Sequence, residues 1–67
     1  MIQVNSSNID SVDYDEVNKV LTVKFTTGAT YLYRGPSPDL YRAFMASHSK
    51  GKFFHQMIRP IFQGIKQ

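Results

Sequence analysis

The chain has 67 residues, a formal net charge of +3 and no cysteine, which allows one domain and excludes a disulfide framework or a thiolate metal site. Its hydrophobic content of 42% is too high for a disordered chain, and no stretch approaches the roughly 20 apolar residues that a membrane span needs. The first ten residues, MIQVNSSNID, lack the basic start and apolar run of a signal peptide, and we expect a cytoplasmic protein.

Three strands are predicted in the first half of the chain. Residues 8–15 alternate in part between polar and apolar side chains, with an irregular start, and residues 19–26 alternate cleanly. Residues 29–34 follow a Thr-Thr-Gly turn and read as a third strand. In the turn between the first two strands, Asn18 is suited to the left-handed conformation. The pattern predicts an antiparallel three-stranded meander.

The Thr-Thr-Gly turn decides which face of the sheet carries two tyrosines. A two-residue loop would place Thr27 at positive φ, which a β-branched residue resists, whereas a three-residue loop places only Gly28 there. We favour the three-residue loop, which puts Tyr31 and Tyr33 on the core face. The other register would expose them on the outer face as a stacking surface.

Two helices are predicted in the second half. Ser37 is a good N-cap for the first, followed by Pro38 at the first helical position. Ser49 can cap the second, and Pro60 should end it near residue 58 or 59. Apolar side chains at helical spacing form the packing faces, namely Leu40, Tyr41, Phe44 and Met45 in the first helix and Phe53, Phe54, Met57, Ile58 and Ile61 in the second.

These elements predict an α+β fold, in which a three-stranded antiparallel β-meander is followed by two helices packed on one face of the sheet. Residues 1–67 would form a single domain. We expect residues 1–5 and 64–67 to fray, because short chain ends are poorly ordered unless they are tied down.

Several short motifs occur in a specific order along the chain. SSNI precedes the first strand, YD ends it, YLY lies in the third strand, and SKGKFF opens the second helix. This order resembles the KTSC domain, a small domain named for the C-terminal region of some lysyl-tRNA synthetases, and the resemblance extends from Ser6 to about Phe62. The chain departs from the family pattern with Asp13-Tyr14 in place of Gly-Tyr and with Gly35-Pro36 in place of Val-Pro. The resemblance implies a domain that occurs alone or fused to a synthetase, a link to tRNA by association, and no catalytic residues.

The SKGK segment, Ser49, Lys50, Gly51 and Lys52, is the candidate site that the resemblance points to. A helix start offers unpaired backbone N–H groups, glycine lets a ligand approach the backbone, and lysines add charge, so a phosphate could bind there. Alternatively, the serine only caps the helix and the glycine only packs tightly against a neighbouring segment. A single glycine excludes a P-loop.

Charge is distributed unevenly, and this widens the candidate surface. Residues 1–33 hold four acidic residues and two lysines, whereas residues 34–67 hold six basic residues and one aspartate. A basic half can attract a polyanion, or it can be the solvated surface of two helices. The further candidates for nucleic-acid contact are Arg34, Arg42 and Arg59, which would bind mainly phosphates with a strong salt dependence.

Catalysis and metal binding are not expected. His48 and His55 are seven residues apart, about 10.5 Å along a helix, which is too far for one metal ion. Acidic residues between 10 and 16 fit a turn and a solvated strand edge. The sequence therefore predicts a non-enzymatic binding module without metal or cofactor, which contacts RNA or tRNA through its basic helical half. The alternative is a module that binds a host or partner protein.

Overall fold

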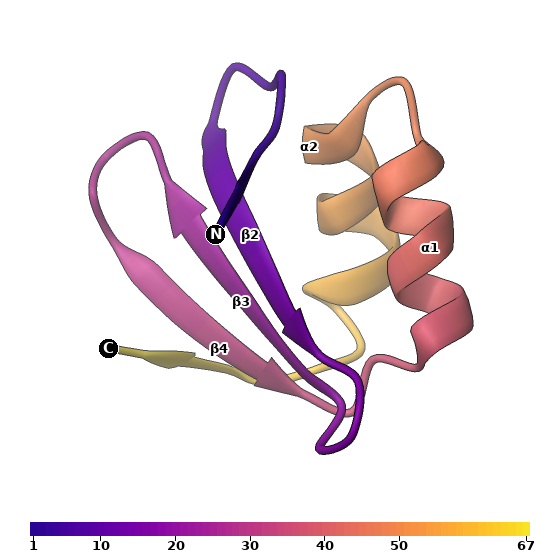
Figure 1. The fold of residues 1–67 in the computed structure, drawn as a ribbon. Helices are drawn as coiled ribbons and strands as arrows, with labels where there is room; N and C mark the ends of the chain where they lie inside the picture. Colours follow the sequence, from indigo (N-terminus) through magenta and orange to yellow (C-terminus); the bar gives the residue numbers. More distant parts are fainter.

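The computed structural model describes residues 1–67 and shows an α+β domain in which a helical layer covers one face of an antiparallel sheet (Figure 1). The sheet has five strands in the order of the chain, each antiparallel to the next. Its strands are β1 (Ile2–Gln3), β2 (Ile9–Asp15), β3 (Val20–Phe25), β4 (Thr30–Arg34) and β5 (Gly64–Lys66). The helical layer consists of α1 (Pro38–Ala46), α2 (Lys50–Phe53) and the π-helical turn η1 (Phe54–Ile58), which continues α2. The predicted fold class is confirmed, but the predicted number of strands is wrong.

The two additional strands lie at the chain ends that we expected to fray. In β1, Ile2 pairs with Val12, and in β5, Ile65 pairs with Leu32. Strands of two and three residues are too short to show a period in the sequence. They form because β2 and β4 are the edges of the central meander, and an edge strand offers unpaired backbone groups to any segment that reaches it.

The register of the central hairpin is the predicted one. Leu21 pairs with Tyr33, and Gly28 has the positive φ of +94° that the three-residue loop requires. The β2–β3 turn differs from the prediction, because Lys19 and not Asn18 adopts the left-handed conformation, with φ of 54°. The side chain of Asp15 accepts hydrogen bonds from the backbone N and the Nδ2 of Asn18. These bonds hold Asn18 in the turn, and the left-handed conformation falls on the next residue, Lys19.

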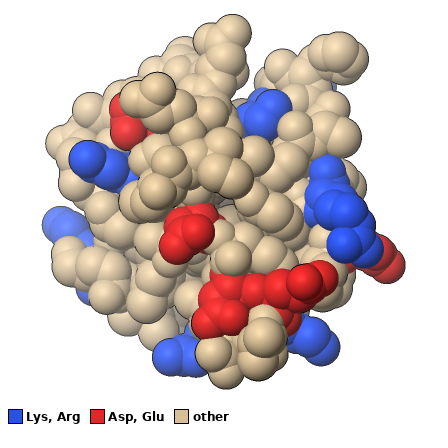
Figure 2. Space-filling model, viewed as in Figure 1, with Lys and Arg blue, Asp and Glu red and all other residues tan.

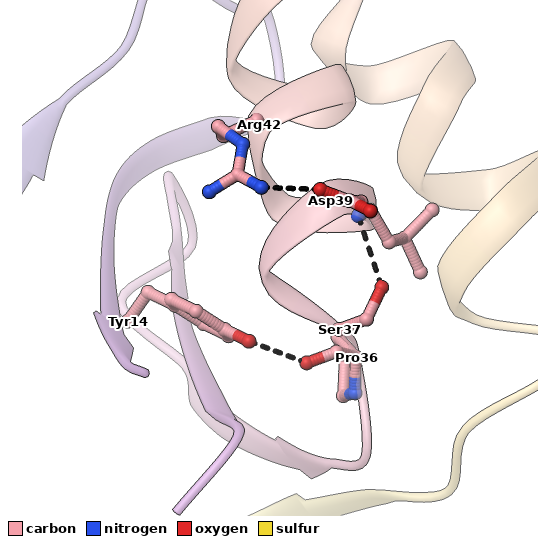
Figure 3. Close-up of polar contacts among 6 residues, drawn as sticks. Tyr14, Pro36, Ser37, Asp39 and Arg42 are labelled. Atoms are coloured by element: carbon pink, nitrogen blue, oxygen red, sulfur yellow. Dashed lines mark hydrogen bonds and ion pairs between the residues drawn. The ribbon is translucent and has the colours of Figure 1, made fainter. Parts of the chain in front are cut away.

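The start of α1 is capped by Ser37 and fixed to the sheet by Tyr14 (Figure 3). Ser37 is the predicted N-cap, and its Oγ accepts a hydrogen bond from the backbone N of Leu40 at 3.1 Å. The hydroxyl of Tyr14 donates to the carbonyl of Pro36 at 2.6 Å, and its ring stacks on Tyr41 with 4.4 Å between centroids. The end of β2 therefore fixes how the start of α1 lies on the sheet.

The second helix buries only part of its predicted packing face. Phe54 and Ile58 are fully buried, as expected, but Met57 and Ile61 are 43% and 63% exposed. Phe54 lies edge-on to the rings of Tyr33 and Phe25, with centroid distances of 5.3 and 5.5 Å. The sequence has two rows of apolar side chains with the same four-residue spacing, one with Met57 and Ile61 and one with Phe54 and Ile58. The contacts of Phe54 with the two rings bury the second row.

Eight apolar side chains, contributed by β2, β3, β4 and both helices, form one core between the sheet and the helical layer: Ile9, Val12, Leu21, Val23, Tyr33, Phe44, Phe54 and Ile58. The longest helix has nine residues, and none of the helices has the length and apolar character needed to cross a membrane.

Candidate nucleic-acid interface

The SKGK segment lies beside the loop between β1 and β2, and the two segments enclose a surface depression of about 450 Å³. Figure 1 shows this loop next to the start of α2, at the top of the view. Every residue that lines the depression is polar or glycine, and none is acidic: Asn5, Ser6, Ser7, Asn8, His48, Ser49, Lys50, Gly51, Lys52 and His55. The SSN motif and the SKGK motif, more than 40 residues apart in the sequence, therefore form one site.

Hydrogen bonds within the β1–β2 loop position its side chains toward α2. Ser6 Oγ accepts from the backbone N of Ile9 at 3.3 Å and donates to Asn8 Oδ1 at 3.0 Å. The other amide atom of Asn8, Nδ2, lies 3.4 Å from Nε2 of His55. Asn8 thus connects the loop to the helical layer, and its side-chain amide forms one wall of the depression.

Gly51 has a packing role in this arrangement. A Cβ atom at this position would lie 2.6 Å from Asn8 Oδ1, closer than side-chain atoms approach in proteins. Of the two interpretations that the sequence left open for this glycine, the structure provides direct support for tight packing against a neighbouring segment. The same close packing brings the two halves of the depression together.

Gly51→Ala is expected to destabilise the free protein by up to about 1 kcal/mol, because the new methyl group displaces the end of the Asn8 side chain and its hydrogen bond with Ser6. Thermal unfolding without any ligand measures this change. Asn8→Ala in the Gly51→Ala background removes the atom that the new methyl group meets, and it should recover part of the loss. A Gly51→Ala protein that melts at the temperature of the parent would contradict the packing role.

Ser49 does not cap the second helix, in contrast to the prediction. Its side chain makes no cap hydrogen bond. Ser47 Oγ instead accepts from the backbone N of Ser49 at 3.2 Å and donates to its carbonyl oxygen at 3.1 Å. Ser49 is exposed and lines the depression.

The two lysines of the segment differ in their surroundings. Lys50 is half-buried, and its Nζ donates to the carbonyl oxygen of Ser47 at 3.0 Å, just after the end of α1. A cation there also compensates the negative end of the α1 dipole, so Lys50 contributes to the fold. Lys52 is exposed and makes no ion pair. It is the lysine of the depression that is free to bind an anion.

Arg34 and Arg42, two further candidates, lie apart from this depression. Arg42 pairs with Asp39 within α1 (Figure 3). Arg34 lines a separate depression on the other face of the sheet, together with Asp13 and Asp15. Figure 2 shows acidic side chains gathered at the lower end of the view, where the β2–β3 turn lies. These arginines therefore face carboxylates and do not extend the SKGK site.

The outer depression around Arg34 is itself acidic in character. Hydrogen bonds from the side chain and the backbone of Asn18 lower the pKa of Asp15, so this carboxylate stays ionised at neutral pH. Two carboxylates beside one arginine give this face little attraction for a polyanion.

Arg59 lies in a groove of about 520 Å³ that adjoins the polar depression and shares His55 with it. The groove is lined by Phe25, Thr27, Tyr31, Tyr33, Phe54, His55 and Arg59, and none of these residues is acidic. Figure 1 shows that the β3–β4 hairpin extends away from the helices, which explains how core-facing rings remain accessible at this end. We name this feature the aromatic groove.

The tyrosines of the aromatic groove occupy the predicted face of the sheet but differ in burial. Tyr33 is 4% exposed, and burial raises the pKa of its hydroxyl, so it remains a neutral phenol. Tyr31 and Phe25 are only half-buried. The predicted register was correct, and of the two tyrosines on the core face only Tyr31 keeps exposed ring surface that could stack on a ligand.

His48 and His55 both line the polar depression, although they are seven residues apart. The structure brings no third histidine, cysteine, aspartate or glutamate into a cluster with them that could hold a metal ion. His55 Nε2 lies within hydrogen-bond distance of Asn8 Nδ2. Sequence reasoning did not place His48, His55 or the loop residues in the site. The SSN motif was the one signal in the sequence that pointed toward that loop.

Comparison with known proteins identifies relatives along almost the whole chain. Residues 5–62 match the KTSC domain. A protein of Tsukamurella paurometabola is 35% identical over 65 residues, which cover 97% of both chains, and a protein of Stutzerimonas stutzeri is 32% identical over 59 residues, which cover 88% of this chain and 83% of the relative. The crystal structure of a KTSC domain protein from Yersinia pestis superimposes with a TM-score of 0.93 at 37% identity and covers 97% of this chain and 92% of the other. This chain therefore belongs to the KTSC domain family.

Proposed function

We propose that this protein is a non-enzymatic binding module whose ligand is RNA, held by its phosphates in the depression between the SSN loop and the SKGK segment. One observation carries the proposal. All ten lining residues are polar or glycine, none is acidic, and Lys52 among them has no ion-pair partner. Such a surface repels no anion and offers a free ammonium group together with hydroxyl, amide and imidazole donors.

Phosphate is the anion that this set of donors matches. Protein side chains contact nucleic-acid phosphates through lysine, serine, asparagine and similar groups, and these contacts position a ligand without reading its bases. We therefore expect binding that falls steeply with salt and selects weakly for sequence. A tRNA belongs to this ligand class, and a cytoplasmic location is part of the same proposal.

A partner protein is the second candidate, favoured by apolar side chains on the edge strands. Ile2 in β1 and Ile65 in β5 are both at least half exposed. Edge strands with unpaired backbone groups can accept a strand from another chain. This interaction would not need Lys52, which separates it from the RNA proposal.

Lys52→Ala is expected to weaken RNA binding and to lower the slope of log K against log salt by about 0.7–0.9, the loss of one phosphate contact. Fluorescence anisotropy of a labelled RNA, titrated at several salt concentrations, measures both effects. Thermal stability should stay nearly unchanged, because an exposed lysine contributes little.

Lys24→Ala is the matched control. Lys24 is also exposed, and it lies on β3 beside core-facing Val23, so it points to the opposite face of the sheet. The Lys24→Ala substitution removes the same charge at a distance from the site, so the slope of log K against log salt should equal that of the parent. Equal effects of Lys24→Ala and Lys52→Ala would mean diffuse attraction without a site. No RNA binding even at low salt would reject the proposal and favour a protein partner.

A further inference from the structure

We infer that the aromatic groove receives an unpaired nucleobase, so that the ligand is single-stranded RNA with a base in the groove and an adjoining phosphate in the polar depression. The phosphate half of this inference rests on the proposed function. The base half rests on a separate set of contacts, those among the rings of the groove.

The groove is built on a continuous series of rings. His55 contacts Phe54 at 5.7 Å between centroids, Phe54 contacts Phe25 at 5.5 Å, and Phe25 contacts Tyr31 at 5.9 Å, each in an edge-to-face arrangement. Phe54 is buried, but Phe25 and Tyr31 retain exposed ring surface. Accessible aromatic rings are the surfaces on which proteins stack unpaired bases.

Cations border these rings. Arg59 lines the groove, is exposed and has no ion-pair partner. Lys66 in β5 is paired directly with Tyr31, and residues directly opposite each other project from the same face of a sheet. The groove thus combines accessible rings with at least one free positive charge and no carboxylate, which complements a base attached to a phosphate chain and disfavours a plain apolar ligand.

His55 connects the two parts of the surface. It lines both the groove and the polar depression, and Asn8 Nδ2 lies 3.4 Å from its Nε2 on the side of the depression. A nucleotide carries a base and a phosphate joined through its ribose, and here a site suited to the base and a site suited to the phosphate lie on either side of one residue. A duplex keeps its bases paired and stacked, so it could place only phosphates here.

The test compares a single-stranded RNA of about ten nucleotides, within the usual site size of such modules, with the duplex formed with its complement. The single strand carries 2-aminopurine, whose fluorescence is quenched when it stacks on an aromatic ring. We expect tighter binding of the single strand and quenching on binding. Tyr31→Leu should weaken single-strand binding by about 5- to 150-fold, the range found when one stacking ring is removed, and should leave duplex binding unchanged. Tyr31→Phe keeps the ring and should bind like the parent.

The outcomes separate this inference from the proposed function. Equal binding of both RNAs without quenching, together with a loss on Lys52→Ala, would overturn the groove inference and leave the phosphate site standing. No binding of either RNA at low salt would overturn both. Because quenching is measured on the parent protein, the inference remains testable even if Tyr31→Leu fails to fold. An acidic, tryptophan-containing peptide that binds where RNA does not would identify a protein segment as the occupant and contradict the inference.

Discussion

Phe54→Ala is expected to lower the free energy of unfolding by about 3–5 kcal/mol, the typical cost of removing a fully buried phenylalanine ring. Phe54 is 1% exposed and lies edge-on to both Phe25 and Tyr33, so its removal leaves a cavity between the helical layer and the sheet. A domain of this size has a small core and modest stability, and the variant should be largely unfolded at room temperature. Thermal and urea unfolding followed by circular dichroism measure the loss.

Met57→Ala is the control for this change, because it truncates a large apolar side chain in the same helical segment. Met57 is 43% exposed, and its loss should cost less than about 1 kcal/mol. Phe54→Leu, which keeps most of the apolar volume, should fall between the two. Equal effects at Phe54 and Met57 would show that the helix presents a different face to the sheet.

Gly35→Ala is expected to cost about 1–3 kcal/mol from backbone strain alone, because φ is +118° at this position. A second cost adds to the first. The new Cβ atom would lie 2.9 Å from Cε1 of Phe62, a half-buried ring that packs against the core. Either this ring or the end of β4 must shift, and the segment that leads into β5 would shift with it. The free energy of unfolding, measured in urea, reports the sum of both effects.

Gly28→Ala provides the matched control for the backbone part. Gly28 also has a positive φ, of +94°, but nothing lies within 4 Å of the position where its Cβ atom would be. The difference between the two variants therefore reports the contact with Phe62 together with the difference in backbone strain between the two φ values. Phe62→Leu in the Gly35→Ala background should reduce the loss, since contacting residues couple in a double-mutant cycle. If Gly28→Ala were the more destabilising change, the contact with Phe62 would be unimportant.

Local chemistry in the sequence determined most of the fold. The alternation of side chains in residues 19–26 and the position of Gly28 set the register of the central hairpin, because both depend only on neighbouring residues and on the backbone preference of glycine. In the same way, Ser37 and Pro38 determined where α1 begins. The family resemblance, carried by short motifs in order, also pointed correctly to the KTSC domain.

The candidate site was only half accessible to sequence reasoning. The SKGK segment was identified, and tight packing of Gly51 was one of two predicted roles, but the cap predicted for Ser49 was wrong and the role of Lys50 was not foreseen. Lys50 binds the carbonyl of Ser47, and Gly51 packs against Asn8. Both roles depend on atoms that the sequence does not place, namely the carbonyl groups after α1 and the side chain of a loop more than 40 residues away.

The remaining features were decided by tertiary structure. β1 and β5 form because the meander offers them open edges, and Phe54 and Ile58 are buried in place of Met57 and Ile61 because the rings of β3 and β4 lie on that side. The aromatic groove exists because the hairpin extends beyond the helical layer and leaves Tyr31 half-buried. A periodic pattern specifies which face of an element is apolar, but it does not specify how far the opposing layer reaches across that face.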